Sequence, residues 1–399
     1  KMEKIRLRSN QKIEKVPLFF QRDELQNLDW SLRLMGIKGA RGVGKTTMLL
    51  QHLRQTHGFS EKALYISLDD IYFTEHKLVN VVEDFYRNGG LHFYLGEVHK
   101  YPNWSLEIKN LYDNYPDLQI VFTGSSMLDI QKSKADLSRR AIMFAIQGLS
   151  FRQFLKLKYQ ISIPVYPLQE VLENANEIIA SQGPAFKPYP YFREYLKSGY
   201  YPFFMDGESW FFERLDAVLH TVIEADMAQL YHIDLKNVRK IYQLLLAVAT
   251  APPFVPNIQK LSERVEISRN TLLQYLYQLA SADMLVLLQS LRTGLTLLQK
   301  PEKILLENTN LLYAIAPSSF DAGALRETFV LNQLKAAHKI NYPDHWGDFV
   351  VDGRYFLEVG GPNKKHKPEK QPDNAYIIAD NWDYKTGNKV PIWLLGLLY

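Results

Sequence analysis

One eight-residue segment has the residue types and the spacing needed to hold phosphate. It reads Gly39, Ala40, Arg41, Gly42, Val43, Gly44, Lys45 and Thr46, a complete match to G-x-x-x-x-G-K-S/T. Glycines let such a loop fold with its backbone N–H groups pointing at phosphate oxygens. Lys45 would reach the β- and γ-phosphates, and the Thr46 hydroxyl would hold Mg²⁺. The segment, together with Thr47, predicts a nucleotide-binding P-loop.

The surroundings of the segment support this interpretation. Residues 32–37 have the apolar pattern of a strand, and residues 46–53 that of a helix. A helix that begins at the loop adds a favourable dipole for the phosphates. No N-K-x-D segment of the guanine-binding kind occurs, which favours ATP over GTP.

A second site position follows residues 91–95, where P-loop ATPases carry Asp-Glu after an apolar strand. The Asp supports Mg²⁺ and the Glu polarises the attacking water. This chain has Gly96 and Glu97 instead, so we expect ATP binding to survive better than turnover. Either the protein is a slow or inactive ATPase, or the glycine is an engineered or errant change. Asp69 or Asp70 could assist, although both are more simply loop carboxylates.

Two further positions could sense the γ-phosphate. Thr123 and Ser125 end an apolar strand, where a polar side chain could contact phosphate; an ordinary turn is the alternative. Arg139 and Arg140 precede the next strand, and an arginine there could stabilise transition-state charge within its own chain or across a subunit boundary. A solvated basic pair is an equal alternative.

These residues need a parallel sheet to bring them together. Short apolar runs alternate with amphipathic stretches such as residues 46–57 and 104–114, which predicts an α/β fold with strands buried on both faces. The expected strands are residues 32–37, 63–67, 91–95, 120–123 and 141–146. We assign residues 1–150 to this P-loop domain.

Three further regions follow. Residues 151–235 form a helical, aromatic-rich segment with an expected loop at residues 184–190. Residues 236–300 have the pattern of a winged helix. Residues 301–399 mix strands and helices, as in a small nuclease-like α/β domain, and end in an apolar strand at residues 391–398.

In the winged helix, residues 257–265 and 269–280 are expected helices, with Ser268 as the N-cap of the second. Residues 284–291 and 296–298 would be the wing strands. Such a unit often places its second helix in the DNA major groove. The side chains expected to be exposed there are Arg269, Asn270, Gln274 and Gln278. One arginine gives little electrostatic attraction, so packing or protein contact is an equal alternative.

The last region carries a carboxylate pattern. Asp348 and Glu358, with Glu327 as a third, fit the acids of a PD-D/E-x-K nuclease, but Gly360 stands where the lysine belongs. Metal-dependent cleavage is therefore the weakest hypothesis, and whether these acids hold a metal stays open.

The composition restricts the remaining classes. The 399 residues carry a formal net charge of +4 and no cysteine, which excludes disulfides and cysteine-based zinc sites. No run approaches the roughly 18 apolar residues of a membrane span, and the first residues lack an apolar signal segment. We expect a cytoplasmic protein that binds ATP and Mg²⁺, with DNA as a possible partner and no membrane contact.

Taken together, these segments resemble the prokaryotic AAA-type ATPases that join a P-loop domain to a winged helix and a degenerate nuclease-like domain. The matching segments are residues 39–47, 95–104, 122–126, 137–154, 195–202, 303–308, 323–334 and 348–361. The resemblance implies an ATPase. It also implies that Arg140 is the family arginine, because the family has Ser-Gly-Arg where this chain has Ser138, Arg139 and Arg140. It implies no defined biological process or oligomeric state.

Overall fold

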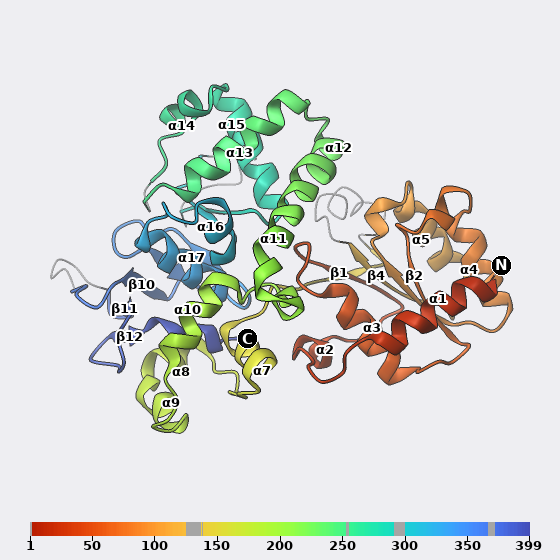
Figure 1. Cartoon of the computed structure of the whole chain (residues 1–399), viewed down its shortest axis with the longest axis horizontal. Helices are drawn as coiled ribbons and strands as arrows, with labels where there is room; N and C mark the ends of the chain where they lie inside the picture. The colour runs from red at the N-terminus through yellow and green to blue at the C-terminus, as the bar shows by residue number, and fades with distance from the viewer. Residues whose placement is uncertain (1, 125–136, 138, 253–254, 291–299, 366–371) are drawn as a thin grey trace. The chain divides into compact units, whose positions relative to one another are not determined.

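The computed structural model describes residues 2–124, 137, 139–252, 255–290, 300–365 and 372–399. The chain divides into two compact units, Lys1–Gly148 and Leu149–Tyr399 (Figure 1). In the described ranges, no helix is long and apolar enough to cross a lipid bilayer.

The first unit is built on one sheet of five parallel strands in the order β2-β3-β4-β1-β5. Its strands are β1 (Leu34–Lys38), β2 (Ala63–Ser67), β3 (His92–Gly96), β4 (Gln119–Gly124) and β5 (Ile142–Ala145). All five lie within two residues of the expected bounds. The α/β fold class predicted from the sequence is thus confirmed, because short apolar runs of this kind pair in parallel when both faces are covered.

Helices cover both faces of this sheet (Figure 1). They are α1 (Met2–Lys15), α2 (Glu24–Asn27), α3 (Lys45–Thr56), α4 (Leu78–Arg87) and α5 (Trp104–Asn114), with short 3-10 helices η1 (Ile71–Thr74) and η2 (Val98–Lys100). Leu64, Phe93 and Ile120 share a core with buried residues of α4 and α5. The alternate side chains face α3, since Nδ1 of His52 lies 2.9 Å from the Tyr94 hydroxyl.

Helix α1 lies against the edge strand β2. The backbone N–H of Tyr65 donates to Oγ of Ser9 at 3.0 Å. A helix beside a sheet edge satisfies backbone groups that would otherwise be open to another strand.

The second unit begins with helices and ends with a sheet. Its helices are α7 (Phe151–Tyr159), α8 (Leu168–Glu173), α9 (Ala175–Ser181), α10 (Pro188–Ser198), α11 (Phe211–His220), α12 (Ala228–Tyr231), α13 (Leu235–Ala249), α14 (Ile258–Val265), α15 (Arg269–Ser281), α16 (Thr309–Ile315) and α17 (Ala322–Leu334). Shorter pieces are the 3-10 helices η3 (Pro202–Asp206), η4 (Glu208–Trp210) and η6 (Ile392–Leu397), and the π-helical η5 (Thr221–Met227).

Two small sheets complete this unit. Strands β6 (Leu285–Leu288) and β7 (Lys303–Leu306) form an antiparallel pair. A mixed sheet has the order β12-β11-β10-β9-β8. Its strands are β8 (Ile340–Asn341), β9 (Phe349–Val351), β10 (Tyr355–Gly360), β11 (Ala375–Ala379) and β12 (Lys389–Pro391).

A buried network of amide side chains joins the helices of this unit. Asn310 donates to the backbone oxygens of Tyr195 and Leu196 at 3.2 and 2.9 Å. Gln333 donates to the Tyr195 hydroxyl at 2.9 Å, and Asn332 to the Glu307 oxygen at 2.9 Å. Three of the family-like segments, residues 195–202, 303–308 and 323–334, therefore meet in a structural core.

The structure corrects two expectations about elements, and a third falls outside the described residues. The expected loop at 184–190 ends early, because Pro188 begins α10, where a proline fits the first helical turn. The expected strand at 391–398 is β12 only as far as Pro391, after which η6 continues as a fully buried 3-10 helix. The wing strand expected at 296–298 lies outside the described residues, and the observed partner of β6 is β7.

Candidate functional site

The P-loop lies between β1 and α3, as the sequence predicts. Gly44 precedes α3 with φ 97°, a left-handed conformation that favours glycine. A Cβ built on Gly39 would lie 2.2 Å from the Ile146 backbone oxygen. Gly39 and Gly44 therefore allow a loop path that side chains would block, which fits a cradle of backbone N–H groups for phosphate.

Lys45 places its charge inside this loop. Its Nζ donates to the backbone oxygens of Gly39 and Ala40, both at 2.7 Å, and the residue is 4% exposed. Thr46 follows in the first turn of α3. The two residues expected to meet the phosphates and the metal are thus both at the helix N-terminus.

Arg22 braces the loop from outside the motif. Its side chain is buried and donates to the Val43 oxygen at 3.1 Å and to the Gly148 oxygen at 2.7 Å. It therefore ties the P-loop to the segment that follows β5. No sequence pattern pointed to Arg22, because it belongs to no motif and lies 17 positions before Gly39.

At the end of β3, Gly96 faces the same side of the sheet as Tyr94, the side that α3 covers. A Cβ built on Gly96 would lie 2.4 Å from the hydroxyl of Tyr65 and 3.4 Å from Oγ of Ser67. Burial raises the pKa of Tyr65 to about 12, so its hydroxyl is neutral near pH 7. The donor set here is a phenol and an alcohol, which does not fit the usual carboxylate support for Mg²⁺.

Glu97, the expected water-polarising residue, has an unusual backbone. Its φ of 53° and ψ of 40° put a non-glycine residue in the left-handed region. One of its oxygens lies 3.8 Å from Nε2 of His99, whose side chain is 2% exposed. Strained backbone of this kind clusters at functional sites.

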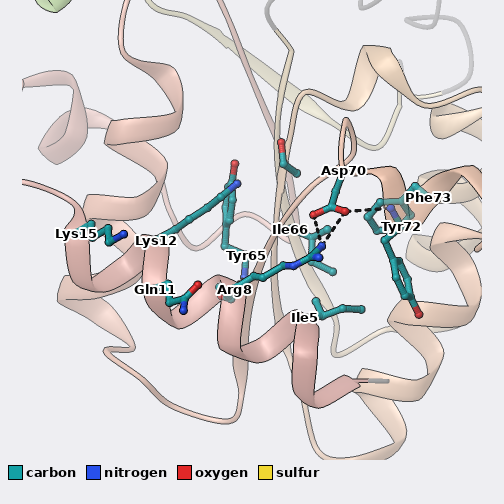
Figure 2. A pocket seen from close by; sticks show the side chains of 12 residues that line it. Ile5, Arg8, Gln11, Lys12, Lys15, Tyr65, Ile66, Asp70, Tyr72 and Phe73 are labelled. Carbon is teal, nitrogen blue, oxygen red and sulfur yellow. Dashed lines mark hydrogen bonds and ion pairs between the residues drawn. The ribbon is translucent and has the colours of Figure 1, made fainter. Parts of the chain in front are cut away.

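The two loop carboxylates after β2 have different surroundings. Asp70 accepts two hydrogen bonds from Arg8 of α1 at 2.9 and 2.7 Å and one from the Tyr72 N–H, and the pKa of Asp70 is lowered. Figure 2 shows these bonds at the mouth of a pocket between α1 and β2, which Lys12 and Tyr65 also line. Asp70 is thus bound to Arg8.

Of the two residues expected to sense the γ-phosphate, the structure describes only Thr123. Thr123 ends β4 on the α3 side, fully buried, with Oγ1 3.5 Å from the Leu95 oxygen. Ser125 lies outside the described residues, so its role stays a prediction.

Arg140 lies at the N-terminal ends of the parallel strands, whereas the P-loop follows the C-terminal end of β1. Arg140 precedes β5, whose other end pairs Ala145 with Lys38. Its guanidinium donates to both carboxylate oxygens of Asp113 at 2.8 and 2.9 Å. The length of β5 alone separates the two ends of the strands by about 10 Å. This arrangement therefore does not bring Arg140 to the phosphates of its own chain. Action across a subunit boundary stays a prediction.

The helices expected in the winged-helix region are present as α14 and α15. Oγ of Ser268 accepts from the Thr271 N–H at 3.1 Å, as expected of an N-cap. Arg269, Asn270 and Gln274 are exposed. Gln278 is buried, 6% exposed, and the expectation that it faces solvent is wrong because α15 is covered along its C-terminal half.

The candidate carboxylates of the C-terminal region, Glu327, Asp348 and Glu358, are paired with lysines. Nζ of Lys303 lies 2.6 Å from Glu327 and 3.1 Å from Asp348, with its side chain 5% exposed. Burial raises the pKa of Glu327 to about 7. Glu358 instead pairs with Lys364 at 2.6 Å. Among the described residues, no group of three or more histidine or acidic side chains is arranged to hold a metal ion.

Lys364 also lies where the nuclease motif would place its lysine. A Cβ on Gly360 would meet the Lys364 side chain at 2.7 Å. Neither Lys303 nor Lys364 was foreseen, since both come from outside the motif spacing. The acids are thus divided between two lysines.

Two families match parts of the chain. Residues 31–155 match a family described as an AAA domain. Residues 31–155 form an AAA-type P-loop domain. Residues 189–321 match a family described as a domain of unknown function.

Individual relatives are distant. An uncharacterized protein of Methanocaldococcus jannaschii is 28% identical over 287 residues, which cover 68% of this chain and 58% of that protein. A Walker-type ATPase of Pyrococcus abyssi has a TM-score of 0.40 at 12% identity, covering 78% of this chain and 95% of the other. AMPPCP-bound DnaA of Aquifex aeolicus has a TM-score of 0.28 at 15% identity, covering 65% and 86%. Similarity at this level is too distant to support an inference about function.

Proposed function

We propose that this chain binds ATP through the P-loop and hydrolyses it slowly or not at all. The observation that carries the proposal is the complete phosphate-binding motif, folded between β1 and α3 with its lysine inside the loop. The residues in contact with nucleotide would be Gly39, Ala40, Arg41, Gly42, Val43, Gly44, Lys45, Thr46 and Thr47.

The residues of the reaction are proposed as follows. Thr46 would offer its hydroxyl to Mg²⁺, and Glu97 would orient the attacking water. Ser125 would contact the γ-phosphate, and Arg140 would act from a neighbouring subunit. Bound Mg²⁺ would neutralise phosphate charge, but Gly96 removes the carboxylate that usually fixes the ion, so turnover should be slow.

The test is ATP binding by isothermal titration calorimetry to the wild-type chain, to Lys45→Ala and to Lys62→Ala. Lys62 is an exposed lysine of the same unit and serves as the matched control. The proposal expects binding that Lys45→Ala abolishes and Lys62→Ala preserves. If ATP does not bind, or if both variants bind like the wild type, the proposal fails.

A second candidate function is nucleotide-switched DNA binding through α15. It is favoured by the exposed Arg269, Asn270 and Gln274 on the N-terminal half of that helix, because Arg and Asn side chains can contact base edges. Salt-dependent DNA binding that Arg269→Ala weakens would support it, and no binding at low salt would end it. A metal-dependent nuclease is less favoured, since Glu327 and Asp348 are bound to Lys303.

A further inference from the structure

The space beside Gly96 is already filled. The strand register pairs Ser67 with Gly96 and Tyr65 with Tyr94, so these side chains share the face that α3 covers. A Cβ on Gly96 would lie 2.4 Å from the Tyr65 hydroxyl, closer than any real contact allows. An aspartate at this position therefore needs Tyr65 to move.

Tyr65 is firmly held. The residue is 3% exposed, and its backbone N–H donates to Ser9 of α1. Its hydroxyl shares a hydrogen bond with Ser67. Nζ of Lys12 lies 5.0 Å from the centre of its ring, and Figure 2 shows the two side chains beside each other in the pocket under α1. Moving the ring would break contacts with both α1 and β2.

We infer that Tyr65 occupies the place of the carboxylate that supports Mg²⁺ in P-loop ATPases, so that this site binds nucleotide with little demand for Mg²⁺. The inference rests on the proposed ATP binding. A neutral phenol oxygen is a much weaker ligand for a divalent cation than a carboxylate is, since Mg²⁺ prefers charged oxygen ligands. Lys45 and the loop N–H groups remain to neutralise the phosphates.

The direct test compares ATP binding to the wild-type chain in MgCl₂ and in EDTA, by calorimetry. We expect the two dissociation constants to agree within about threefold, because position 96 supplies no carboxylate to fix the metal. A dissociation constant weakened more than about thirtyfold in EDTA would overturn it, since that is the loss expected when a supported metal is removed.

Paired variants test whether Tyr65 is the cause. Gly96→Asp with Tyr65→Val makes room for the carboxylate and should gain about tenfold or more in Mg²⁺ dependence of ATP binding. Gly96→Asp alone should lower the melting temperature without that gain, and Tyr65→Val alone is the control. If the double variant folds and shows no added Mg²⁺ dependence, the role of Tyr65 is refuted; if it does not fold, the wild-type comparison decides.

A measurement without nucleotide checks the geometry. Gly96→Ala should lower the melting temperature, and Tyr65→Phe should restore most of the loss, because the ring carbon that carried the hydroxyl lies 3.2 Å from the new Cβ. Equal losses in both backgrounds would overturn the inference. The outcomes also separate it from the proposed function: no ATP binding in either buffer ends the proposed function, whereas Lys45-dependent binding that requires Mg²⁺ ends only the role given to Tyr65.

Discussion

Replacing Arg22 by methionine should loosen the P-loop without touching the motif itself. The side chain is buried and makes two charge-assisted hydrogen bonds, to the oxygens of Val43 and Gly148. Hydrogen bonds to charged groups contribute about 1.5–3 kcal/mol each, and methionine replaces part of the lost packing. We therefore expect the local opening of the loop to become about 3 kcal/mol easier.

Hydrogen exchange measured by mass spectrometry reports this opening directly. Peptides that cover residues 39–46 and 143–148 should exchange faster in Arg22→Met. ATP affinity should also fall, by up to roughly 150-fold if the full 3 kcal/mol must be recovered when the cradle is ordered on binding. Arg54→Met is the matched control, since Arg54 also donates to two backbone oxygens, those of Glu14 at 2.9 Å and Val16 at 3.0 Å. Equal ATP affinities in the two variants would refute the bracing role of Arg22.

Three further predictions concern charges elsewhere. Lys303→Met should destabilise the chain to denaturant by about 3–5 kcal/mol, because it removes the cation that pairs with the buried Glu327 and the half-buried Asp348. Adding Glu327→Gln to the same chain should recover part of the loss, and an unchanged stability of Lys303→Met would contradict the pairing. Burial, with neighbouring histidines, lowers the pKa of His52 from 6.5 to about 4. As the pH falls, His52 is therefore protonated in the unfolded chain before it is protonated in the folded one. The contribution of neutral His52 to the free energy of unfolding should be complete above pH 6.5 and be lost as the pH falls towards 4. His52→Gln should therefore flatten the dependence of the melting temperature on pH over this range. Arg140→Ala and Asp113→Ala should both leave the ATP affinity of the monomer unchanged. If Arg140→Ala alone lowers ATP affinity, and does so only when the chain assembles, Arg140 acts between subunits.

The central sheet could be predicted because its strands are read from local pattern. Short apolar runs bounded by polar turns located all five strands within two residues, and the glycines of the P-loop identified the loop between β1 and α3. Ser268 likewise identified the start of α15, since an N-cap acts on its own helix.

The remaining features depend on contacts between distant positions. Tyr65 meets Gly96 only after β2 and β3 pair, and Lys303 meets Glu327 only after β7 packs on α17. Gln278 has the polarity of a surface residue, yet tertiary packing covers it. A proline-rich stretch suggested a loop, but Pro188 and Pro190 lie in the first turn of α10, where proline is tolerated. The contacts of Tyr65, Lys303 and Gln278 are not encoded in local spacing.

The proposed function treats nucleotide binding and hydrolysis separately because of the loop geometry and the tyrosine beside Gly96. The loop residues are in place to bind phosphate, whereas Tyr65 fills the space of the usual metal-supporting carboxylate.

The most direct measurement is the dissociation constant of ATP for the wild-type chain and for Lys45→Ala, determined by calorimetry with Lys62→Ala beside them. We expect measurable binding that is lost in Lys45→Ala and kept in Lys62→Ala. Wild-type affinity in Lys45→Ala, or no binding to the wild type, would contradict it.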